Sequence, residues 1–192
     1  MNRGFAQLNI VCGTNGTGKS TRMDEIIKVS PFDNAIVYVE SIDLYGKPFA
    51  GLPTVLMSKY RGGKVTIDAD TIKFPHFIDA IVKHYRNGLL IIDEAGMYKL
   101  MDGDDFIPAV KELFKQRRKF NIEIYLVYHG VSEIPVRVIK WCTNFILFHQ
   151  TDEFKHKGGV IPRIEELKAM QLRIREQYFK GNKYYCEYLQ LS

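Results

Sequence analysis

The chain has 192 residues, of which 46% are hydrophobic and 26% charged, and this composition excludes an intrinsically disordered protein. The length is that of one domain, so we expect residues 1–192 to fold around a single core. Lys and Arg outnumber Asp and Glu by 27 to 22, which gives a formal charge of +5 and favours a polyanionic partner without requiring one.

The first predicted element is an apolar strand that leads into a glycine-rich turn. Residues 8–12 read Leu-Asn-Ile-Val-Cys, and residues 13–20 read Gly-Thr-Asn-Gly-Thr-Gly-Lys-Ser. This spacing is that of a P-loop, in which glycines let backbone N–H groups surround a phosphate and the following helix, expected at residues 21–29, adds the positive end of its dipole. The alternative is a flexible glycine turn, which the flanking strand and helix disfavour. The residues predicted to bind ATP are Gly13, Thr14, Asn15, Gly16, Thr17, Gly18, Lys19, Ser20 and Thr21.

Two side chains at the end of this turn have specific predicted roles. Lys19 would reach the β- and γ-phosphates of ATP with its positive charge, and the Ser20 hydroxyl would bind Mg²⁺. We therefore place Lys19 among the predicted catalytic residues and Ser20 among the predicted metal ligands.

The middle of the chain alternates strand and helix patterns. The expected strands are residues 35–39, 65–67, 89–94, 122–128 and 143–148, and the expected helices are residues 74–87 and 104–119. Alternation at this spacing implies right-handed crossovers and a doubly wound, mostly parallel central sheet flanked by helices, which is an α/β fold. Together with the P-loop motif, this predicts a P-loop NTPase. Residues 41–63 show no period and are expected to form a surface loop. Its basic run at residues 59–64 is either solvated or in contact with nucleic-acid phosphates.

A continuously apolar strand is expected to end in two carboxylates, Asp93 and Glu94. Such a strand suits the middle of a parallel sheet that is covered on both faces. A triphosphate site needs acidic groups opposite the P-loop, so we predict that Asp93 binds Mg²⁺ through water and that Glu94 polarises the water that attacks the γ-phosphate. The alternative is an acidic pair that simply ends a strand. Together with Lys19 and Ser20, the pair favours an Mg²⁺-dependent ATPase.

Two arginines, Arg117 and Arg118, stand shortly before the strand expected at residues 122–128. A guanidinium that stabilises transition-state charge is commonly supplied by a neighbouring subunit. The alternative is a basic helix terminus that opposes its own dipole. The residues themselves leave both interpretations open.

The end of the chain predicts a helix at residues 161–178 followed by a β-hairpin. Residues 178–189 contain two aromatic, alternating runs on either side of Gly181-Asn182, which is a hairpin signal. The interleaved aromatic and lysine side chains could stack on bases, but a hairpin that covers the edge of a sheet is the commoner arrangement.

The three cysteines, Cys12, Cys142 and Cys186, are odd in number and form no C-x-x-C pair, so neither a disulfide framework nor a zinc site is expected. No apolar run reaches the length of a transmembrane helix, and the N-terminal residues do not have the pattern of a signal peptide. We therefore expect a cytoplasmic protein without a transmembrane segment.

Taken together, these motifs resemble the FtsK/HerA superfamily of DNA-pumping ATPases. The resemblance rests on the P-loop, on Leu-Leu-Ile-Ile-Asp-Glu-Ala-Gly at residues 89–96, and on Gln-Arg-Arg-Lys-Phe-Asn-Ile-Glu-Ile-Tyr-Leu-Val-Tyr-His at residues 116–129 with Ile-Pro after it. Order and spacing match over about residues 6–152. The resemblance implies a RecA/FtsK-like core, with Arg117 or Arg118 as a finger that acts on the neighbouring subunit and His129 as the sensor of the γ-phosphate. The family usually has glutamine at the position of His129.

Within the superfamily, this small chain is similar to the genome-packaging ATPases of membrane-containing icosahedral viruses. That similarity implies a homo-oligomeric ring, a hexamer or a pentamer, that pumps double-stranded DNA in the host cytoplasm or on the virion. A viral portal or membrane vertex protein would be a further partner. The Zot-like assembly ATPases of filamentous phages are the next most similar group, and a small-molecule kinase on the same fold is a third alternative. Asp93 and Glu94 favour water over a kinase acceptor as the nucleophile.

Overall fold

The computed structural model describes residues 6–32, 36–40, 47–48, 63–66, 73–155 and 160–191, and for residues 36–40, 47–48, 63–66 and 73 it describes the backbone alone. The predicted surface loop therefore lies largely outside the described residues, and its basic residues 59–62 lie outside them entirely. Within the described part of the chain, no helix is both long and apolar enough to cross a membrane.

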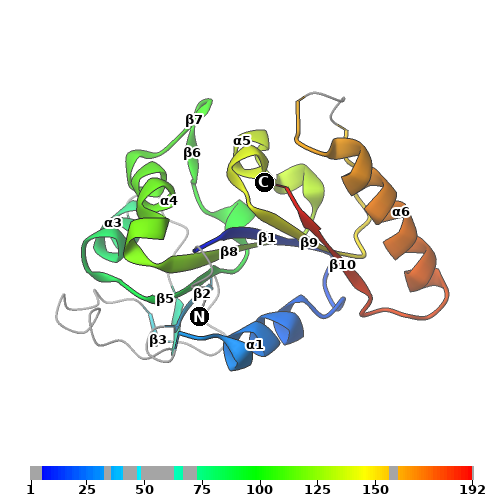
Figure 1. Cartoon of the computed structure of the whole chain (residues 1–192), viewed down its shortest axis with the longest axis horizontal. Helices are drawn as coiled ribbons and strands as arrows, with labels where there is room; N and C mark the ends of the chain where they lie inside the picture. Colours follow the sequence, from blue (N-terminus) through cyan, green and yellow to red (C-terminus); the bar gives the residue numbers. More distant parts are fainter. Residues whose placement is uncertain are drawn as a thin grey trace.

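A mostly parallel sheet forms the centre of the molecule (Figure 1). Among the described residues it contains eight strands in the order β10-β9-β1-β8-β5-β2-β4-β3, and each neighbouring pair is parallel except β10 and β9. The predicted α/β fold is thus confirmed. The strands are β1 (Leu8–Cys12), β2 (Ile36–Glu40), β3 (Lys47–Pro48), β4 (Gly63–Thr66), β5 (Gly88–Ile92), β8 (Ile122–Tyr128), β9 (Asn144–Phe148) and β10 (Cys186–Gln190).

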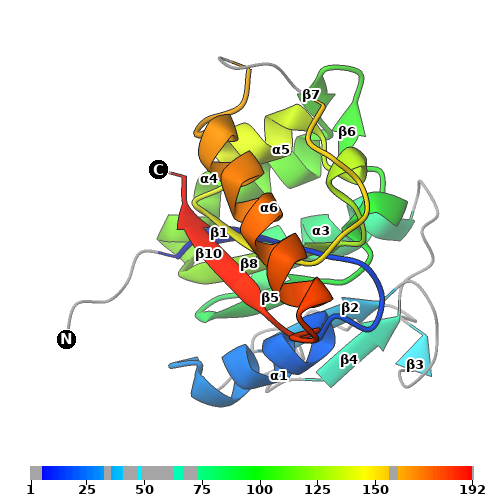
Figure 2. The same ribbon diagram turned by 90° about the vertical axis from the view of Figure 1, so that its right-hand side faces the viewer.

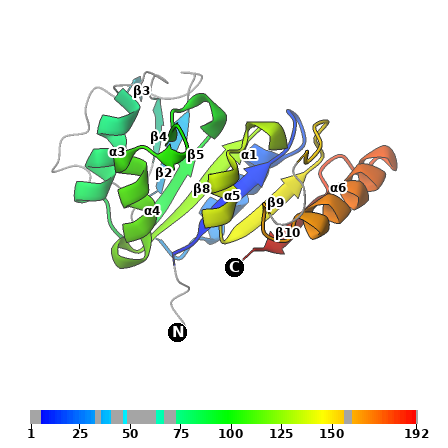
Figure 3. The ribbon, with the colours of Figure 1, turned by 90° about the horizontal axis from the view of Figure 1, so that it is seen from above.

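Helices cover both faces of this sheet, but unequally. Helix α1 lies on one face, and the other helices lie on the opposite face, with α6 beyond the last strands (Figures 1 and 3). In Figure 2, α6 and β10 run side by side at that end of the sheet. The helices are α1 (Lys19–Val29), α3 (Lys73–His84), α4 (Pro108–Phe120), α5 (Val136–Trp141) and α6 (Ile164–Phe179).

The core follows from this unequal covering. The larger part lies between the sheet and α3 to α6, where Phe77, Phe114 and Leu167 are fully or almost fully buried. The smaller part lies under α1, where Met23 packs against Val11 and its neighbours on the sheet. Strands β1, β5 and β9 are buried at each position, because side chains pointing to either face meet a helix.

The predicted C-terminal hairpin is wrong. Helix α6 continues through Phe179, and the one strand in this segment, β10, pairs antiparallel with β9. Gly181 has a φ of +92°, and its N–H donates to the carbonyl of Tyr178 (3.0 Å), which closes the last turn of the helix. Glycine in this conformation ends a helix as readily as it turns a hairpin. The first aromatic run belongs to the helix, where the Tyr178 ring stacks on His149 with centroids 3.7 Å apart.

The helix predicted from Asp104 begins later, at Pro108. Before it, strands β6 (Met101–Asp102) and β7 (Asp105–Phe106) form a short hairpin that projects from the sheet (Figure 1). The Asp105 carboxylate forms ion pairs with Lys111 and with Arg137 (3.0 Å). Proline supports a helix start because its missing N–H has no partner in the first turn in any case. The acidic residues, which resembled a helix start, belong to the hairpin instead.

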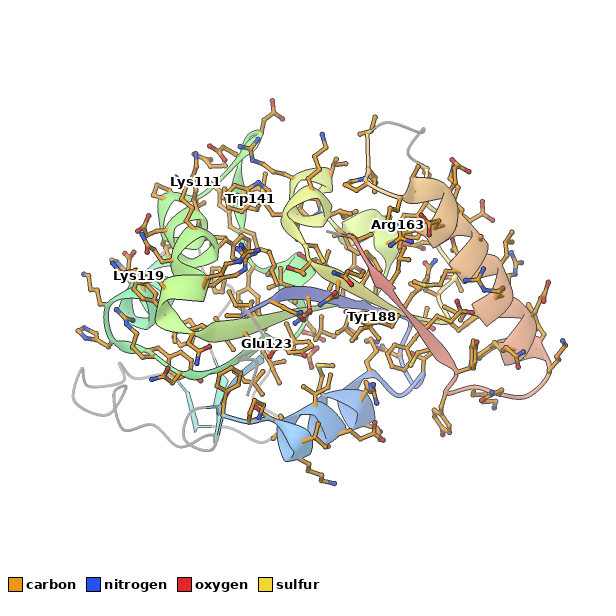
Figure 4. The ribbon with its side chains drawn as sticks, in the orientation of Figure 1. Lys111, Lys119, Glu123, Trp141, Arg163 and Tyr188 are labelled. Atoms are coloured by element: carbon orange, nitrogen blue, oxygen red, sulfur yellow. The ribbon has the colours of Figure 1, made fainter. Side chains whose placement is uncertain are left out.

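A row of polar side chains joins four neighbouring strands on the α1 side of the sheet. The amide of Asn144 in β9 donates to Oδ1 of Asn9 in β1 (2.7 Å), and the amide of Asn9 donates to Oε1 of Glu123 in β8 (3.2 Å). The hydroxyl of Tyr188 in β10 donates to Oδ1 of Asn144. Figure 4 shows Glu123 and Tyr188 on the same side of the sheet as α1. Asn9 and Asn144 are only 2% and 1% exposed, so Oδ1 of Asn9 depends on the Asn144 amide for its hydrogen bond.

We expect Asn144→Ala to lower the free energy of unfolding by about 1–3 kcal/mol, because it leaves the buried carbonyl of Asn9 without a donor. Asn182→Ala is the control, since the Asn182 side chain is exposed and its truncation should cost less than about 0.5 kcal/mol. Urea denaturation followed by circular dichroism measures both. Equal losses in the two variants would contradict a special role for the buried pair.

Candidate nucleotide-binding site

The predicted phosphate-binding loop connects β1 to α1 at the carboxyl edge of the sheet. Two backbone hydrogen bonds hold its start: the N–H of Gly13 donates to the carbonyl of Tyr128 (3.2 Å), and the N–H of Thr14 donates to the carbonyl of His149 (2.9 Å). Tyr128 ends β8 and His149 follows β9, and these are the two strands that flank β1. The loop is therefore held from both sides.

Gly18 and Gly13 each need to be glycine, for different reasons. Gly18, at the N-terminal cap of α1, has a φ of +96°, which residues with a side chain rarely adopt. At Gly13 the constraint is space, since a Cβ atom would lie 2.6 Å from Cβ of Phe148 and 3.2 Å from the carbonyl oxygen of His149. The loop backbone thus packs directly on the end of β9, and its glycines have the structural role that the P-loop pattern predicts.

Backbone carbonyls of the loop hold the ammonium group of Lys19. Its side chain is only 7% exposed, and its ammonium group donates to the carbonyls of Gly13 and Thr14, the latter at 2.9 Å. Burial lowers the pKa of Lys19, and nearby acidic side chains oppose that effect. The groups that raise the pKa are, in decreasing order, Cys12, Asp93, Glu133 and Glu94. The predicted acidic pair therefore lies close enough to act on the predicted phosphate-binding lysine.

The remaining residues of the loop divide into two sets. Thr17 is buried, and its hydroxyl donates to the carbonyl of Thr14 (2.7 Å), so it serves the structure of the loop. The accessible residues, at the tip of the loop and in the first turn of α1, are Asn15, Gly16, Ser20 and Thr21. A hydroxyl at the second position of a helix, beside a buried lysine, suits a metal ion that bridges to phosphate.

Asp93 and Glu94 follow β5 at the same edge of the sheet. Glu94 has a φ of +50°, an uncommon conformation for a residue with a side chain and one that often marks functional sites. Its N–H donates to Oδ1 of Asp93 (3.0 Å), and its Oε1 lies 3.4 Å from Nε2 of His129, which follows β8. The structure thus brings the predicted water-polarising carboxylate and the predicted sensor together.

Glu133 is a residue of this edge that the sequence analysis missed. It lies in the short helix η2 (Val131–Glu133), and its Oε2 accepts a hydrogen bond from the backbone N–H of His129 (3.3 Å). Its charge also acts on Lys19. The sequence held one signal for Glu133, an acidic residue four positions after His129. The position of Glu133 near the loop, however, depends on how the chain turns after β8.

Arg117 and Arg118 lie far from this group. Both are in the last turn of α4, which leads into the start of β8, whereas the loop is held at the end of β8. A strand of seven residues separates the two ends by roughly 20 Å. The Arg117 guanidinium donates to the carbonyl of Phe114, and burial lowers its pKa, while Arg118 is exposed. Neither arginine is placed to act on the loop of its own chain.

Comparisons with known proteins address the fold. No family model matches the chain, and no curated protein matches it. Among solved structures, this chain is similar to the genome packaging NTPase B204 from Sulfolobus turreted icosahedral virus 2, at 17% sequence identity. The match covers 100% of this chain and 94% of the B204 chain. The TM-score is 0.64 for the complex with ATP-gammaS and 0.68 for the complex with AMP. The chain has the fold of this P-loop NTPase.

A second structure gives the same result. The structure of B204, the DNA-packaging ATPase from Sulfolobus turreted icosahedral virus, has a TM-score of 0.68 and 16% sequence identity to this chain. The match covers 97% of this chain and 93% of the B204 chain. The near-complete coverage of both chains supports the predicted P-loop NTPase fold. At these identities the likeness concerns the fold alone.

Proposed function

We propose that this protein is a motor that hydrolyses ATP with Mg²⁺ and moves double-stranded DNA, as in viral genome packaging. The observation that carries the proposal is the pairing, at one edge of the sheet, of a glycine-rich loop around Lys19 with the carboxylates of Asp93 and Glu94. The fold shared with B204, which is described as a DNA-packaging ATPase, supports the DNA part of the proposal.

In this proposal each residue of the site has one task. Residues 13–21 bind the triphosphate through backbone N–H groups and the Lys19 ammonium. Ser20 and Asp93 would hold Mg²⁺, which takes most of its remaining ligands from phosphates and water and neutralises phosphate charge. Glu94 orients and polarises the attacking water, and His129, 3.4 Å from Glu94, senses the γ-phosphate. Within the described residues no three His, Cys, Asp or Glu side chains are arranged to hold a metal by themselves, so metal binding would depend on the nucleotide.

A ring of identical subunits completes the site. Because Arg117 and Arg118 lie at the opposite edge of the sheet from their own loop, a role in catalysis requires that they reach the loop of a neighbouring subunit. A heterologous interface of this kind closes into a ring, here a hexamer or a pentamer, around the DNA. A viral portal or a membrane vertex protein would anchor that ring.

We expect Lys19→Ala to abolish ATP binding and Glu94→Gln to retain binding while hydrolysis falls at least about 100-fold, because the first removes phosphate charge compensation and the second removes only the group that polarises water. Binding is measured by titration calorimetry and turnover by phosphate release. Asp104→Asn, an acidic-to-amide change in the β6–β7 hairpin, is the matched control. Hydrolysis by Glu94→Gln at the unmodified rate would exclude Glu94 as the catalytic base.

We expect mixtures of Lys19→Ala chains with Arg117→Ala or Arg118→Ala chains to recover ATPase activity that each variant lacks alone. In an equal mixture, about one interface in four pairs an intact loop with an intact arginine on the neighbouring subunit. Phosphate release is measured after subunit exchange has been verified by mass. Absence of recovery in rings that do exchange subunits would contradict action between subunits.

We expect double-stranded DNA to raise the ATPase rate, and DNA affinity to be independent of base sequence and to fall steeply with salt, since a motor holds phosphates rather than base edges. Fluorescence anisotropy over a salt series and phosphate release with and without a duplex test both points. Intact ATPase activity with no DNA binding at low salt would refute the motor and favour an assembly ATPase that moves no DNA.

A further inference from the structure

A cavity of about 360 Å³ lies beside the phosphate-binding loop. Its volume falls within the range of about 300–1,000 Å³ that is usual for small-ligand pockets. Its walls come from three separate parts of the chain: the first turns of α1, the end of β9, and the start of β10 with the segment before it. The lining residues include Gly18, Thr21, Arg22, Phe148, Tyr184 and Cys186.

The order of the strands places this cavity on the side of the loop away from the carboxylates. Strands β8 and β5, which are followed by His129 and by Asp93, lie on one side of β1, and β9 and β10 lie on the other. Because β10 runs antiparallel to β9, its first residue, Cys186, pairs with the last residue of β9, Phe148. The segment just before β10, with Tyr184, is thereby brought to the carboxyl edge, beside the loop.

Tyr184 is an exposed aromatic residue that forms one wall of this cavity. Its side chain is 71% exposed, so its ring is open to a ligand in the cavity. It also touches the loop, because a Cβ atom on Gly18 would lie 3.2 Å from Cδ1 of Tyr184 and 3.8 Å from Cε1 of Phe148. The phosphate-binding loop therefore continues directly into an aromatic surface.

The rim of the cavity is polar. Arg22 and Glu25 on α1 form an ion pair at 2.9 Å, and their side chains are 48% and 55% exposed. Phe148, at 2% exposure, lies at the buried end. A flat ring on one side, an apolar floor and charged groups at the edge suit a planar heterocycle that carries polar atoms on its periphery.

We propose that this cavity binds the base of the nucleotide, with the base stacked on Tyr184 and its edge facing Arg22. The inference rests on the proposed function only in placing a nucleoside triphosphate on the loop. The γ-phosphate then lies toward Asp93 and Glu94, and the nucleoside extends to the opposite side, where the cavity is. Because stacking strength grows with the area of the rings, the site binds purine nucleoside triphosphates more tightly than pyrimidine ones.

The test is titration calorimetry with ATP, CTP and inorganic tripolyphosphate, each with Mg²⁺, on the full chain. We expect Tyr184→Ala to weaken ATP binding about 5- to 100-fold, which is the usual effect of removing one base–aromatic stack, and to narrow the ratio of ATP to CTP affinity. Tripolyphosphate has no base, so its affinity should not change. Tyr184→Phe keeps the ring and should bind ATP as the unmodified chain does.

Phe179→Ala is the matched control, because Phe179 is as exposed as Tyr184, at 72%, and lies on α6 outside the walls of the cavity. It should leave ATP affinity unchanged. Unchanged ATP affinity in Tyr184→Ala would overturn the proposal, and so would equal losses for ATP and tripolyphosphate, since these would mean that Tyr184 only shapes the loop. Failure of the unmodified chain to bind either ligand would instead refute the nucleotide site itself, whereas ATPase activity without DNA movement leaves the base site intact.

Discussion

The arrangement of the site depends on two backbone hydrogen bonds, from Gly13 to the end of β8 and from Thr14 to the residue after β9. They fix the loop between its two neighbouring strands, and they do so only because a bare glycine lets the loop approach Phe148. Since parallel strands end at the same edge of a sheet, whatever follows β5 and β8 must then lie beside the loop. That is why Lys19 is influenced by carboxylates that are more than 70 residues away in the chain.

Strand β10, which is antiparallel to β9, gives the site its second side. A parallel last strand would begin at the far edge of the sheet, whereas β10 begins at the carboxyl edge, opposite Phe148. The short connection from α6, which Gly181 closes in a left-handed conformation, therefore delivers Tyr184 to the loop. Carboxylates and the histidine stand on one side of β1 and the aromatic surface stands on the other, so the two sides of the loop differ in chemistry.

Sequence patterns predicted the parts of this site whose signal is local. The glycine spacing, the apolar strand before Asp93 and the alternation of elements each depend on neighbouring residues, and the sheet, the P-loop fold and the position of Glu94 follow from them. The predicted C-terminal hairpin was wrong because one local signal fits two structures: Gly181 suits a hairpin turn and a helix end equally well. Glu133 was missed because its position depends on how the chain turns after β8, and strand order, which decides where Tyr184 lies, is not encoded in any short pattern.

The contact between His129 and Glu94 constrains what this histidine can do at the site. The Nε2 atom of His129 lies 3.4 Å from Oε1 of Glu94, and it donates to this carboxylate in the tautomer that carries the proton on Nε2. In the neutral ring Nδ1 is then an acceptor, and it has no hydrogen-bond partner within the described part of the chain. A phosphate oxygen also only accepts hydrogen bonds, so Nε2 of His129 would have to leave Glu94 in order to donate to the γ-phosphate. Arrival of the phosphate would then free the carboxylate to orient water, which would link nucleotide sensing to catalysis through one contact.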